Sequence, residues 1–385
     1  MTDETVSPCL EVTRVVAEIG GQDMYKCMQC GLCAGICPWR TVDSPFSMRK
    51  VLHQNQLGVE GFESDDIIFA CTQCRMCENN CPRGVGTSGV IRAVRAMLYE
   101  SGALPKPVQA ALGNIRGEGN PMAGERSARL DWAKKLEQPL PAEGERALFS
   151  CCVSAYDPRG QQSHRALATV LRAADPEISG FGTELSCCGG TLRAVGAEDL
   201  FELVSDKNRQ VFQKRGLKEL IVDSPHAYDS FLHDYFGEDE EPPIKVKHYT
   251  EYLAERLEAG HLKMTKPFAK KVTYHDPCYL GKLNKVFEPP RQLLQAVPEL
   301  ELVEMPRNRE ASLCCGGGGG RMWMETPAER RFGVLRVKEA LEAGAEVIAT
   351  SCPYCVSMFE DGRLVLDAED KIEVLDVAEL IAKTL

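Results

Sequence analysis

Eight cysteines in the first hundred residues fall into two runs with the same spacing. The first run reads CMQCGLCAGICP and the second reads CTQCRMCENNCP, so both follow C-x2-C-x2-C-x3-C-P. In runs of this kind three thiolates wrap one iron-sulfur cube, and the fourth cysteine reaches a second cube. The chemistry of such a pair is the transfer of single electrons. The expected ligands are Cys27, Cys30, Cys33 and Cys81 for one 4Fe-4S cluster, and Cys71, Cys74, Cys77 and Cys37 for the other.

The cysteine content of the whole chain also indicates metal binding. The 385 residues include 18 cysteines, far more than a protein of a reducing compartment normally carries. A disulfide framework is typical of short secreted chains, and this chain is long. Structural zinc is the other alternative, but zinc sites usually take cysteines in pairs rather than in a triplet followed by Cys-Pro.

A second group of five cysteines lies near the C-terminus. The members are Cys278, Cys314, Cys315, Cys352 and Cys355, spaced as C-x35-CC-x36-C-x2-C. Five thiols exceed what an ordinary cube takes. Adjacent ligands require the main chain to approach the cluster closely, and the glycines that follow them, Gly316, Gly317 and Gly318, permit positive φ angles and direct N–H groups at sulfur. The run to Gly320 is therefore expected to cradle a cluster; the alternative is a flexible loop beside two buried cysteines.

An earlier part of the chain repeats this pattern with an offset of 126 to 128 residues. Cys152 corresponds to Cys278, and the pair Cys187 and Cys188 corresponds to Cys314 and Cys315. The repeat then departs from the pattern, because SPHA stands at 224–227 where CPYC stands at 352–355.

Three conventional thiols cannot complete a five-cysteine site in the first copy. The expectation there is an empty or merely structural site. The alternative is a smaller or conventional iron-sulfur cluster on Cys152, Cys187 and Cys188, with His226 or Cys151 as its fourth ligand, because imidazole replaces thiolate in some iron-sulfur centres.

Histidine and aspartate beside the late cysteines are the candidate catalytic groups. His275 and Asp276 precede Cys278 and would either supply a proton or a hydrogen bond to the cluster, or fix the turn after a strand. Both readings stay open. His164 and His248 have no cysteine near them in the sequence and are expected to be structural or solvated.

Predicted strands and helices position these residues. Cys152 follows the apolar run ALF, Cys278 follows KVTYHDP and Cys352 follows EVIATS, so each lies beyond the carboxyl end of a predicted strand. In open α/β sheets ligands bind at that edge. In the N-terminal part, SPFSMRKVLHQNQL predicts a helix with Ser44 as its cap and an end near Gly58, and SGVIRAVRAMLYESG predicts another.

These elements predict an α/β chain with an all-α ferredoxin-like N-terminal domain followed by two repeated α/β modules. The expected divisions are a helical domain at 1–104, a linker at 105–145 with some helix around Arg126 to Leu136, module 1 at 146–260 and module 2 at 268–385.

Charge and hydropathy narrow the partners. The net charge of -11 argues against nucleic acid. The longest run without a formal charge, Val347 to Phe359, is too short to span a bilayer, and the N-terminal residues lack the features of an export signal. We therefore expect a cytoplasmic protein whose partners are proteins or small molecules.

Three segments carry a family resemblance: HDPCYLG at 275–281, NREASLCCGGGGG at 308–320 and SCPYC at 351–355. With the duplicated module and the N-terminal cysteine runs, they resemble the CCG motif of the D-type subunit of heterodisulfide reductase. The N-terminal domain is similar to the helical ferredoxin domain of succinate dehydrogenase and heterodisulfide reductase subunits. The resemblance implies a noncubane 4Fe-4S cluster on the five late cysteines, able to contact thiol or disulfide sulfur.

The resemblance also implies a function. The chain is expected to be an iron-sulfur electron-transfer subunit of an anaerobic oxidoreductase complex, similar to those of class II benzoyl-CoA reductase, between a flavin- or quinone-linked partner and a terminal reductase. It would lie in the cytoplasm, or at the inner membrane face through a partner. The alternatives are a catalytic thiol/disulfide reductase subunit and a zinc scaffold. The five glycines follow a cysteine pair rather than forming G-x-G-x-x-G, so no nicotinamide or flavin signature is present.

Overall fold

The computed structural model describes residues 8–59, 66–236 and 243–385. The chain forms two compact units, which we treat separately. The first consists of Met1–Gln109, Thr191–Asp199 and Gly317–Arg330, and the second of Ala110–Gly190, Leu200–Gly316 and Arg331–Leu385.

The expectation about an export signal falls partly on residues 1–7, outside the described residues. In the described part of the chain, no helix is both long and apolar enough to cross a membrane.

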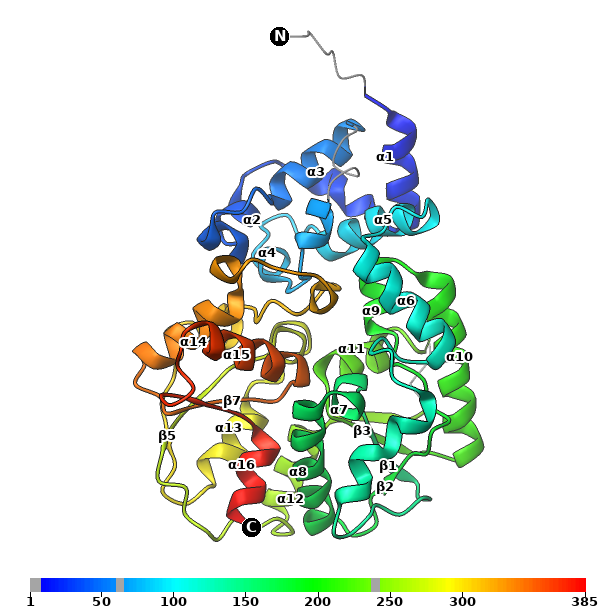
Figure 1. Cartoon of the computed structure of the whole chain (residues 1–385). Coiled ribbons are helices and arrows are strands. Elements are labelled where there is room, and N and C mark those ends of the chain that lie inside the picture. The colour runs from blue at the N-terminus through cyan, green and yellow to red at the C-terminus, as the bar shows by residue number, and fades with distance from the viewer. Residues whose placement is uncertain (1–7, 60–65, 237–242) are drawn as a thin grey trace. The chain divides into compact units, whose positions relative to one another are not determined.

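Helices and loops make up the described N-terminal part of the first unit (Figure 1). The helical elements are α1 (Leu10–Val16), η1 (Ala17–Gly21), η2 (Gln22–Lys26), α2 (Leu32–Gly35), η3 (Pro38–Val42), α3 (Met48–Leu57), η4 (Asp66–Ala70), α4 (Met76–Asn79) and α5 (Thr87–Glu100). Helix α5 packs against η1, η2 and α3, and buries its apolar side there.

The start of α3 differs from the prediction. Ser47, not Ser44, is the N-cap, and its hydroxyl accepts a hydrogen bond from the Lys50 N–H at 3.4 Å. The Ser44 hydroxyl accepts from the Phe46 N–H instead, so it closes a turn before the helix. The predicted end is confirmed, because Gly58 ends the helix in the left-handed conformation that glycine tolerates.

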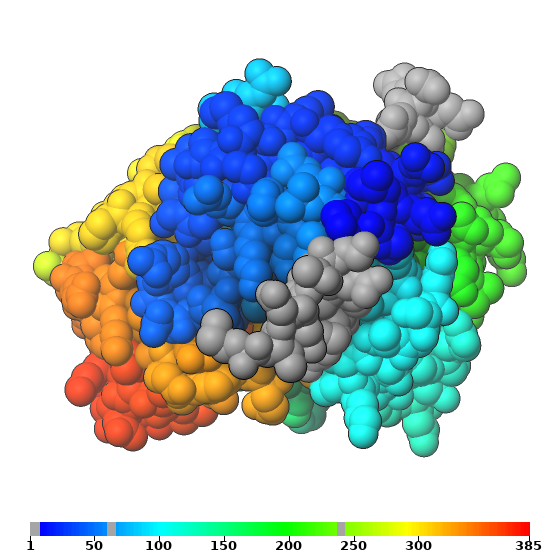
Figure 2. Space-filling model, turned by 90° about the horizontal axis from the view of Figure 1, so that it is seen from above, coloured from blue at the N-terminus to red at the C-terminus, as the bar shows by residue number. Residues whose placement is uncertain are grey.

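Two short segments from far along the sequence complete the first unit. They carry most of α9 (Gly190–Val195), and η8 (Arg321–Trp323) and η9 (Ala328–Arg330). Element η9 contacts η3, and the space-filling view shows orange atoms of the late segment beside the blue atoms of the N-terminal residues (Figure 2). The segments that follow both cysteine pairs therefore belong to the unit with the two N-terminal cysteine runs.

The second unit contains two parallel four-stranded sheets with the same topology. Strands β1 (Arg146–Phe149), β2 (Ser179–Gly180), β3 (Glu219–Val222) and β4 (Lys245–His248) lie in the order β2-β1-β3-β4. Strands β5 (Lys271–Tyr274), β6 (Glu301–Leu302), β7 (Val347–Thr350) and β8 (Glu373–Asp376) lie in the order β6-β5-β7-β8. All the pairings are parallel, and the two repeated α/β modules of the prediction are confirmed.

Helices connect the strands within each module. Module 1 has α7 (Cys152–Tyr156), α8 (Pro158–Ala174), α10 (Glu198–Arg215), α11 (Pro225–His233) and α12 (Tyr249–Glu258). Module 2 has η6 (Tyr279–Leu283), α13 (Glu288–Gln295), η7 (Arg309–Ala311), α14 (Phe332–Glu342), α15 (Pro353–Val365) and α16 (Val377–Thr384).

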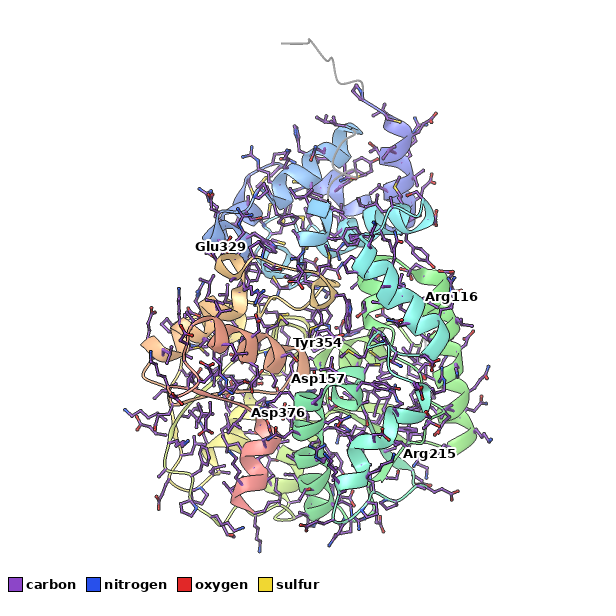
Figure 3. All side chains as sticks on the ribbon, in the orientation of Figure 1. Arg116, Asp157, Arg215, Glu329, Tyr354 and Asp376 are labelled. Atoms are coloured by element: carbon purple, nitrogen blue, oxygen red, sulfur yellow. The ribbon has the colours of Figure 1, made fainter. Side chains whose placement is uncertain are left out.

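The two modules share one core. Helix α8 of module 1 packs on α16 of module 2, and α12 of module 1 packs on α13 of module 2, so helices from both copies interleave. Buried Leu148, Tyr252, Val272 and Leu380 belong to one apolar cluster. The Tyr249 hydroxyl donates to Asp376 over 2.6 Å. Asp376 is the N-cap of α16 and is labelled in Figure 3. The modules therefore form a single folded body.

The segment predicted as a linker contains more helix than expected. Element η5 (Arg126–Lys135) occupies the stretch where some helix was predicted, but α6 (Lys106–Glu118) was not predicted. Gly113 and Gly117 weaken its helical pattern, whereas Pro107 stands in the first turn, where proline is tolerated. Tertiary burial of the apolar side chains Ala111, Leu112 and Ile115 overrides the weak propensity.

Candidate iron-sulfur centres

The eight N-terminal cysteines gather into two pockets of the first unit. One pocket is lined by Cys27, Cys30, Cys33 and Cys81, and the other by Cys37, Cys71, Cys74 and Cys77. Each pocket thus takes three cysteines from one run and the fourth from the other. Burial raises the pKa of the Cys33 thiol, and the thiols around it raise it further; burial and neighbouring thiols raise that of Cys77 more strongly. Thiols of this kind lose their protons when they bind iron as thiolates.

Both N-terminal runs use the same strained backbone. Gln29 and Gln73, one residue before the second cysteine of each run, have φ of 60° and 53°. Their N–H groups donate to the sulfur atoms of Cys27 and Cys71, each at 3.4 Å. Non-glycine residues rarely adopt this conformation, and where they do it commonly serves a site. Sequence reasoning did not single out these glutamines, although their identical position in both runs was a usable signal.

Three of the five late cysteines follow the two strands between which the order of the second sheet reverses. Strands β5 and β7 are neighbours, and the chain leaves them in opposite directions along the sheet, which is where open α/β sheets bind ligands. Cys278 follows β5, and Cys352 and Cys355 follow β7 as the N-cap and first turn of α15. The pair Cys314 and Cys315 lies in the loop after β6.

These five thiols are all buried, and three of them touch. Cys355 hydrogen-bonds with Cys315 and Cys352, while burial, followed by these contacts, raises its pKa well above the usual value. The helix N-terminus beside Cys352 and Cys355 favours negative charge, so it stabilises their thiolate form once a metal replaces the protons.

The glycine run after Cys315 has two distinct parts. Gly316 has φ of +101°, and its N–H donates to the Cys314 sulfur at 3.3 Å. Gly319 belongs to the first unit and has φ of +62°; a Cβ there would lie 2.3 Å from the carbonyl oxygen of Cys71. The carbonyls of Gly317 and Gly318 accept from the Met322 and Arg321 N–H groups and close the turn that contains Gly319 and Gly320. A positive φ therefore favours glycine at 316, and close approach of backbone also requires it at 319.

Asp276 is fully engaged in fixing the loop before the cysteine pair. Its carboxylate accepts two hydrogen bonds from buried Arg291, at 2.7 and 2.9 Å, and a third from the Arg309 N–H at 2.7 Å. Its carbonyl accepts from the Ser312 hydroxyl at 3.0 Å. These contacts orient the chain that enters Cys314.

His275 is a buried hydrogen-bond acceptor. Its Nδ1 accepts from the Arg336 guanidinium at 3.1 Å, and its ring packs edge-on against Phe359. Burial lowers the pKa of His275 well below its usual value, and the charges of Arg336 and Lys282 lower it further. The two predicted roles of His275 and Asp276, to serve the cluster or to fix the turn after the strand, both stay predictions.

Module 1 keeps the scaffold of this site with different donors. Cys152 follows β1, the pair Cys187 and Cys188 follows β2, and Ser224 takes the N-cap position of α11 after β3. The Gly189 N–H donates to the Cys187 sulfur at 3.5 Å, with φ of +87°, which matches Gly316 in module 2.

The histidines of module 1 have structural surroundings. The half-buried ring of His226 packs on Tyr279 and on Tyr354, at the start of α15, with centroid distances of 4.0 and 4.6 Å (Figure 3). Burial lowers its pKa to about 4. His164 is buried and lies 2.9 Å from Asp223, and His248 is the buried N-cap of α12.

One buried arginine joins three separate stretches of the first unit. Arg95 on α5 donates to the carbonyls of Ile68, Cys71, Ala194 and Gly319 over 2.7 to 2.9 Å. The Gln73 side chain also donates to the Ala194 carbonyl, at 3.1 Å. The loop of the second N-terminal cysteine run is thus tied to the segments that follow both cysteine pairs. Sequence reasoning missed Arg95, although a charged residue between Ile91, Val94 and Leu98 on an apolar helix face was a signal.

Comparison with known proteins agrees with this arrangement. The family model described as a 4Fe-4S dicluster domain matches residues 23–85, and the model described as the CCG cysteine-rich domain matches residues 146–228 and 272–360.

Three curated relatives are similar over most of the chain. The probable iron-sulfur-binding oxidoreductase FadF of Bacillus subtilis is 36% identical over 84% of this chain and 47% of its own length. The EtfAB:quinone oxidoreductase of Syntrophomonas wolfei is 33% identical over 83% of this chain and 47% of its own length. The D-type subunit of the dihydromethanophenazine:CoB–CoM heterodisulfide reductase of Methanosarcina barkeri is 29% identical over 97% of both chains.

The chain spans about half the length of the first two relatives and nearly all of the third. Matches to both kinds of domain cover the cysteine sets described above. The chain therefore contains a 4Fe-4S dicluster domain and two copies of the CCG cysteine-rich domain, and over nearly its whole length it is similar to the D-type subunit of heterodisulfide reductase.

Proposed function

We propose that this chain is the electron-relay subunit of a multi-subunit anaerobic oxidoreductase. It passes single electrons between two 4Fe-4S clusters in the first unit and a noncubane 4Fe-4S cluster in module 2. A flavin- or quinone-linked partner stands at one end of this path and a terminal reductase at the other. The relay works in the cytoplasm, or at the inner membrane face through a partner.

The two cysteine pockets of the first unit support the first part of the path. Their donor sets are four thiols each, and N–H groups of Gln29 and Gln73 already point at sulfur. Cys278, Cys314, Cys315, Cys352 and Cys355 are the proposed ligands of the noncubane cluster. When bound, the clusters supply one-electron chemistry; the protein sets their spacing, potential and access to solvent.

The hydrogen bonds of Arg95 are the observation that carries the proposal. They fix Gly319 beside the Cys71 loop, and Gly319 follows Cys315 by four residues. We propose that the cluster of Cys71, Cys74, Cys77 and Cys37, whose loop Arg95 ties to the segment that follows Cys315, is the one that exchanges electrons with module 2.

The printed names of the relatives support a place in such a complex. One names a quinone as the partner of an oxidoreductase, and another is a subunit of a heterodisulfide reductase. A flavin- or quinone-linked partner would deliver or remove electrons at the cluster of Cys27, Cys30, Cys33 and Cys81, whose Cys30 is exposed.

A thiol/disulfide reductase is the second candidate, favoured by the match to the heterodisulfide reductase relative over 97% of both chains. Ser224 and Ala227 replace the last two cysteines in module 1, so the chain has a single five-cysteine set rather than two. Addition of low-molecular-weight thiols separates the functions. A perturbed noncubane signal in electron paramagnetic resonance supports the reductase, whereas an unperturbed one supports the relay.

Rapid-mixing reduction of anaerobically purified protein tests the relay. When a reductant donates electrons to the first unit, the cluster of Cys71 should be reduced first and the module 2 centre after it. The Cys74→Ser variant should slow reduction of the module 2 centre by at least about a hundredfold, measured by freeze-quench electron paramagnetic resonance. Equal rates in the two proteins would contradict the relay.

A further inference from the structure

A buried arginine beside the cysteines of module 1 has no acidic partner. Arg129 on η5 is 3% exposed. Its guanidinium donates to the Ser150 carbonyl at 2.9 Å and to the Cys152 sulfur at 3.9 Å, and it lies over the Phe149 ring. Among the residues that the structure describes, no carboxylate pairs with it. A buried cation of this kind is costly unless negative charge lies next to it.

The carboxylate of this region is engaged elsewhere. Asp223 accepts the Cys151 N–H at 2.9 Å and lies 2.9 Å from Nδ1 of His164. The Cys152 sulfur, which accepts from the guanidinium at 3.9 Å, can supply the charge that matches Arg129.

Four buried thiols of module 1 are the candidate donors. Cys151, Cys152, Cys187 and Cys188 are all at least nine-tenths buried. The Cys152 thiol hydrogen-bonds with Cys187, and Cys187 hydrogen-bonds with Cys188. Cys151 interacts electrostatically with both Cys152 and Cys187. Buried thiols repel one another once ionised, so only a metal centre lets all four become thiolates together.

One buried polar atom of module 1 makes no hydrogen bond to the described residues. The Ser224 hydroxyl is fully buried and makes no hydrogen bond to any described residue. It occupies the position that Cys352 has in module 2. Backbone space is limited too, because a Cβ on Gly190 would lie 3.8 Å from the Cys188 sulfur and 3.3 Å from the His226 carbonyl. The unpaired Ser224 hydroxyl, the close fit at Gly190 and the four thiols are together compatible with an anionic metal-sulfur group.

We infer that module 1 binds an iron-sulfur cluster through Cys151, Cys152, Cys187 and Cys188, with Arg129 as the fixed counter-charge that sets its potential. The cluster supplies a further one-electron centre when bound. Ser224 donates a hydrogen bond to its sulfur. This assignment replaces the expectation of an empty site, and it favours Cys151 over His226, whose ring is stacked against two tyrosines. The inference does not depend on the relay, because the iron and sulfide content of the protein is the same whichever way electrons move.

Metal analysis of the full-length anaerobic protein tests the ligand set. The Cys152→Ser/Cys187→Ser double variant should lose iron and sulfide equal to one cluster, while the signals of the other centres stay unchanged. Cys9→Ser is the matched control, because Cys9 lies outside every cysteine set, and it should lose nothing. Unchanged iron and sulfide in the double variant would overturn the inference, as would loss of zinc without sulfide.

Arg129 is tested by potentiometric titration followed by electron paramagnetic resonance. The Arg129→Leu variant should shift one centre to a lower potential by at least about 59 mV, a tenfold change in the reduced-to-oxidised ratio of a one-electron couple. Arg129→Lys keeps the charge and should retain most of the original potential. If Arg129→Leu fails to fold, the lysine variant still tests the role of the charge, and the double cysteine variant still tests the ligand set. A fully loaded Arg129→Leu protein with no shift in any centre would overturn the role of Arg129.

Discussion

Modules 1 and 2 have the same scaffold and different donors. Their strand order is identical, and in both an N–H two residues after the first cysteine of the pair donates to its sulfur. After the third strand, both begin a helix with an extended N-cap residue followed by proline. Only the side chains change, from CPYC at 352–355 to SPHA at 224–227. The fold therefore brings the same positions to the reversal of strand order in both modules, and the modules differ in the side chains that they carry there.

The buried cations of the two sites differ as well. In module 2, buried Lys282 donates to the Ser312 carbonyl and so supports the loop before Cys314. In module 1, Arg129 comes from outside the matched domain and donates directly to Cys152 sulfur. The two modules therefore differ in whether this buried cation donates to a sulfur atom or to a backbone carbonyl.

Loss of one ligand in module 2 should have the largest effect. The Cys355→Ser variant should abolish the noncubane signal in electron paramagnetic resonance, because that thiol contacts both Cys315 and Cys352. The two ferredoxin-type signals should remain, since their proposed ligands belong to the other unit. Loss of all signals together would show that the sites are not independent.

Gain of ligands in module 1 should make the two modules alike. Ser224→Cys/Ala227→Cys restores the five-cysteine pattern on an unchanged backbone. We expect a second noncubane signal with an intensity comparable to that of module 2, and a rise in iron per chain no larger than one cluster. Ser224→Cys alone is the control and should not produce that signal. Absence of a new signal in a folded double variant would show that the scaffold does not determine the site.

Replacement of a glycine beyond the cysteine pair should have an intermediate effect. Gly319→Ala brings a Cβ within 2.3 Å of the Cys71 carbonyl. Gly344→Ala is the matched control, since its φ of +74° is similar but nothing lies within 4 Å. The control should lose about 1–2 kcal/mol of stability from backbone strain alone. Gly319→Ala should lose clearly more in anaerobic thermal unfolding and slow reduction of the module 2 centre; equal losses would contradict the close approach.

The smallest effect concerns pH. Burial raises the pKa of Asp376, which accepts from Tyr249, from 3.8 to about 7. The folded protein then keeps a proton that the unfolded chain releases, so stability should fall as the pH rises from about 4 to about 7, by up to about 1.4 kcal/mol per pH unit. Asp376→Asn retains a good N-cap for α16 and should remove this slope. Parallel slopes in denaturant titrations of the two proteins would contradict the shift.

Cysteine spacing predicted much of the candidate site. Strand ends before Cys152, Cys278 and Cys352 follow from apolar runs, and the repeat follows from equal offsets, so both are local properties of the sequence. Arg95 and Arg129 could not be assigned in this way, because their roles depend on carbonyl and sulfur atoms brought near by tertiary packing. The same reason explains the missed helix α6, whose glycines weaken a pattern that burial then stabilises.

Iron-edge anomalous scattering from crystals of anaerobically prepared protein tests the central claim most directly. The account predicts iron among the sulfur atoms of Cys278, Cys314, Cys315, Cys352 and Cys355, in addition to iron in both pockets of the first unit. Sulfur atoms of module 2 that are joined to each other, or dispersed with no iron between them, in a protein whose first unit is fully loaded would contradict it.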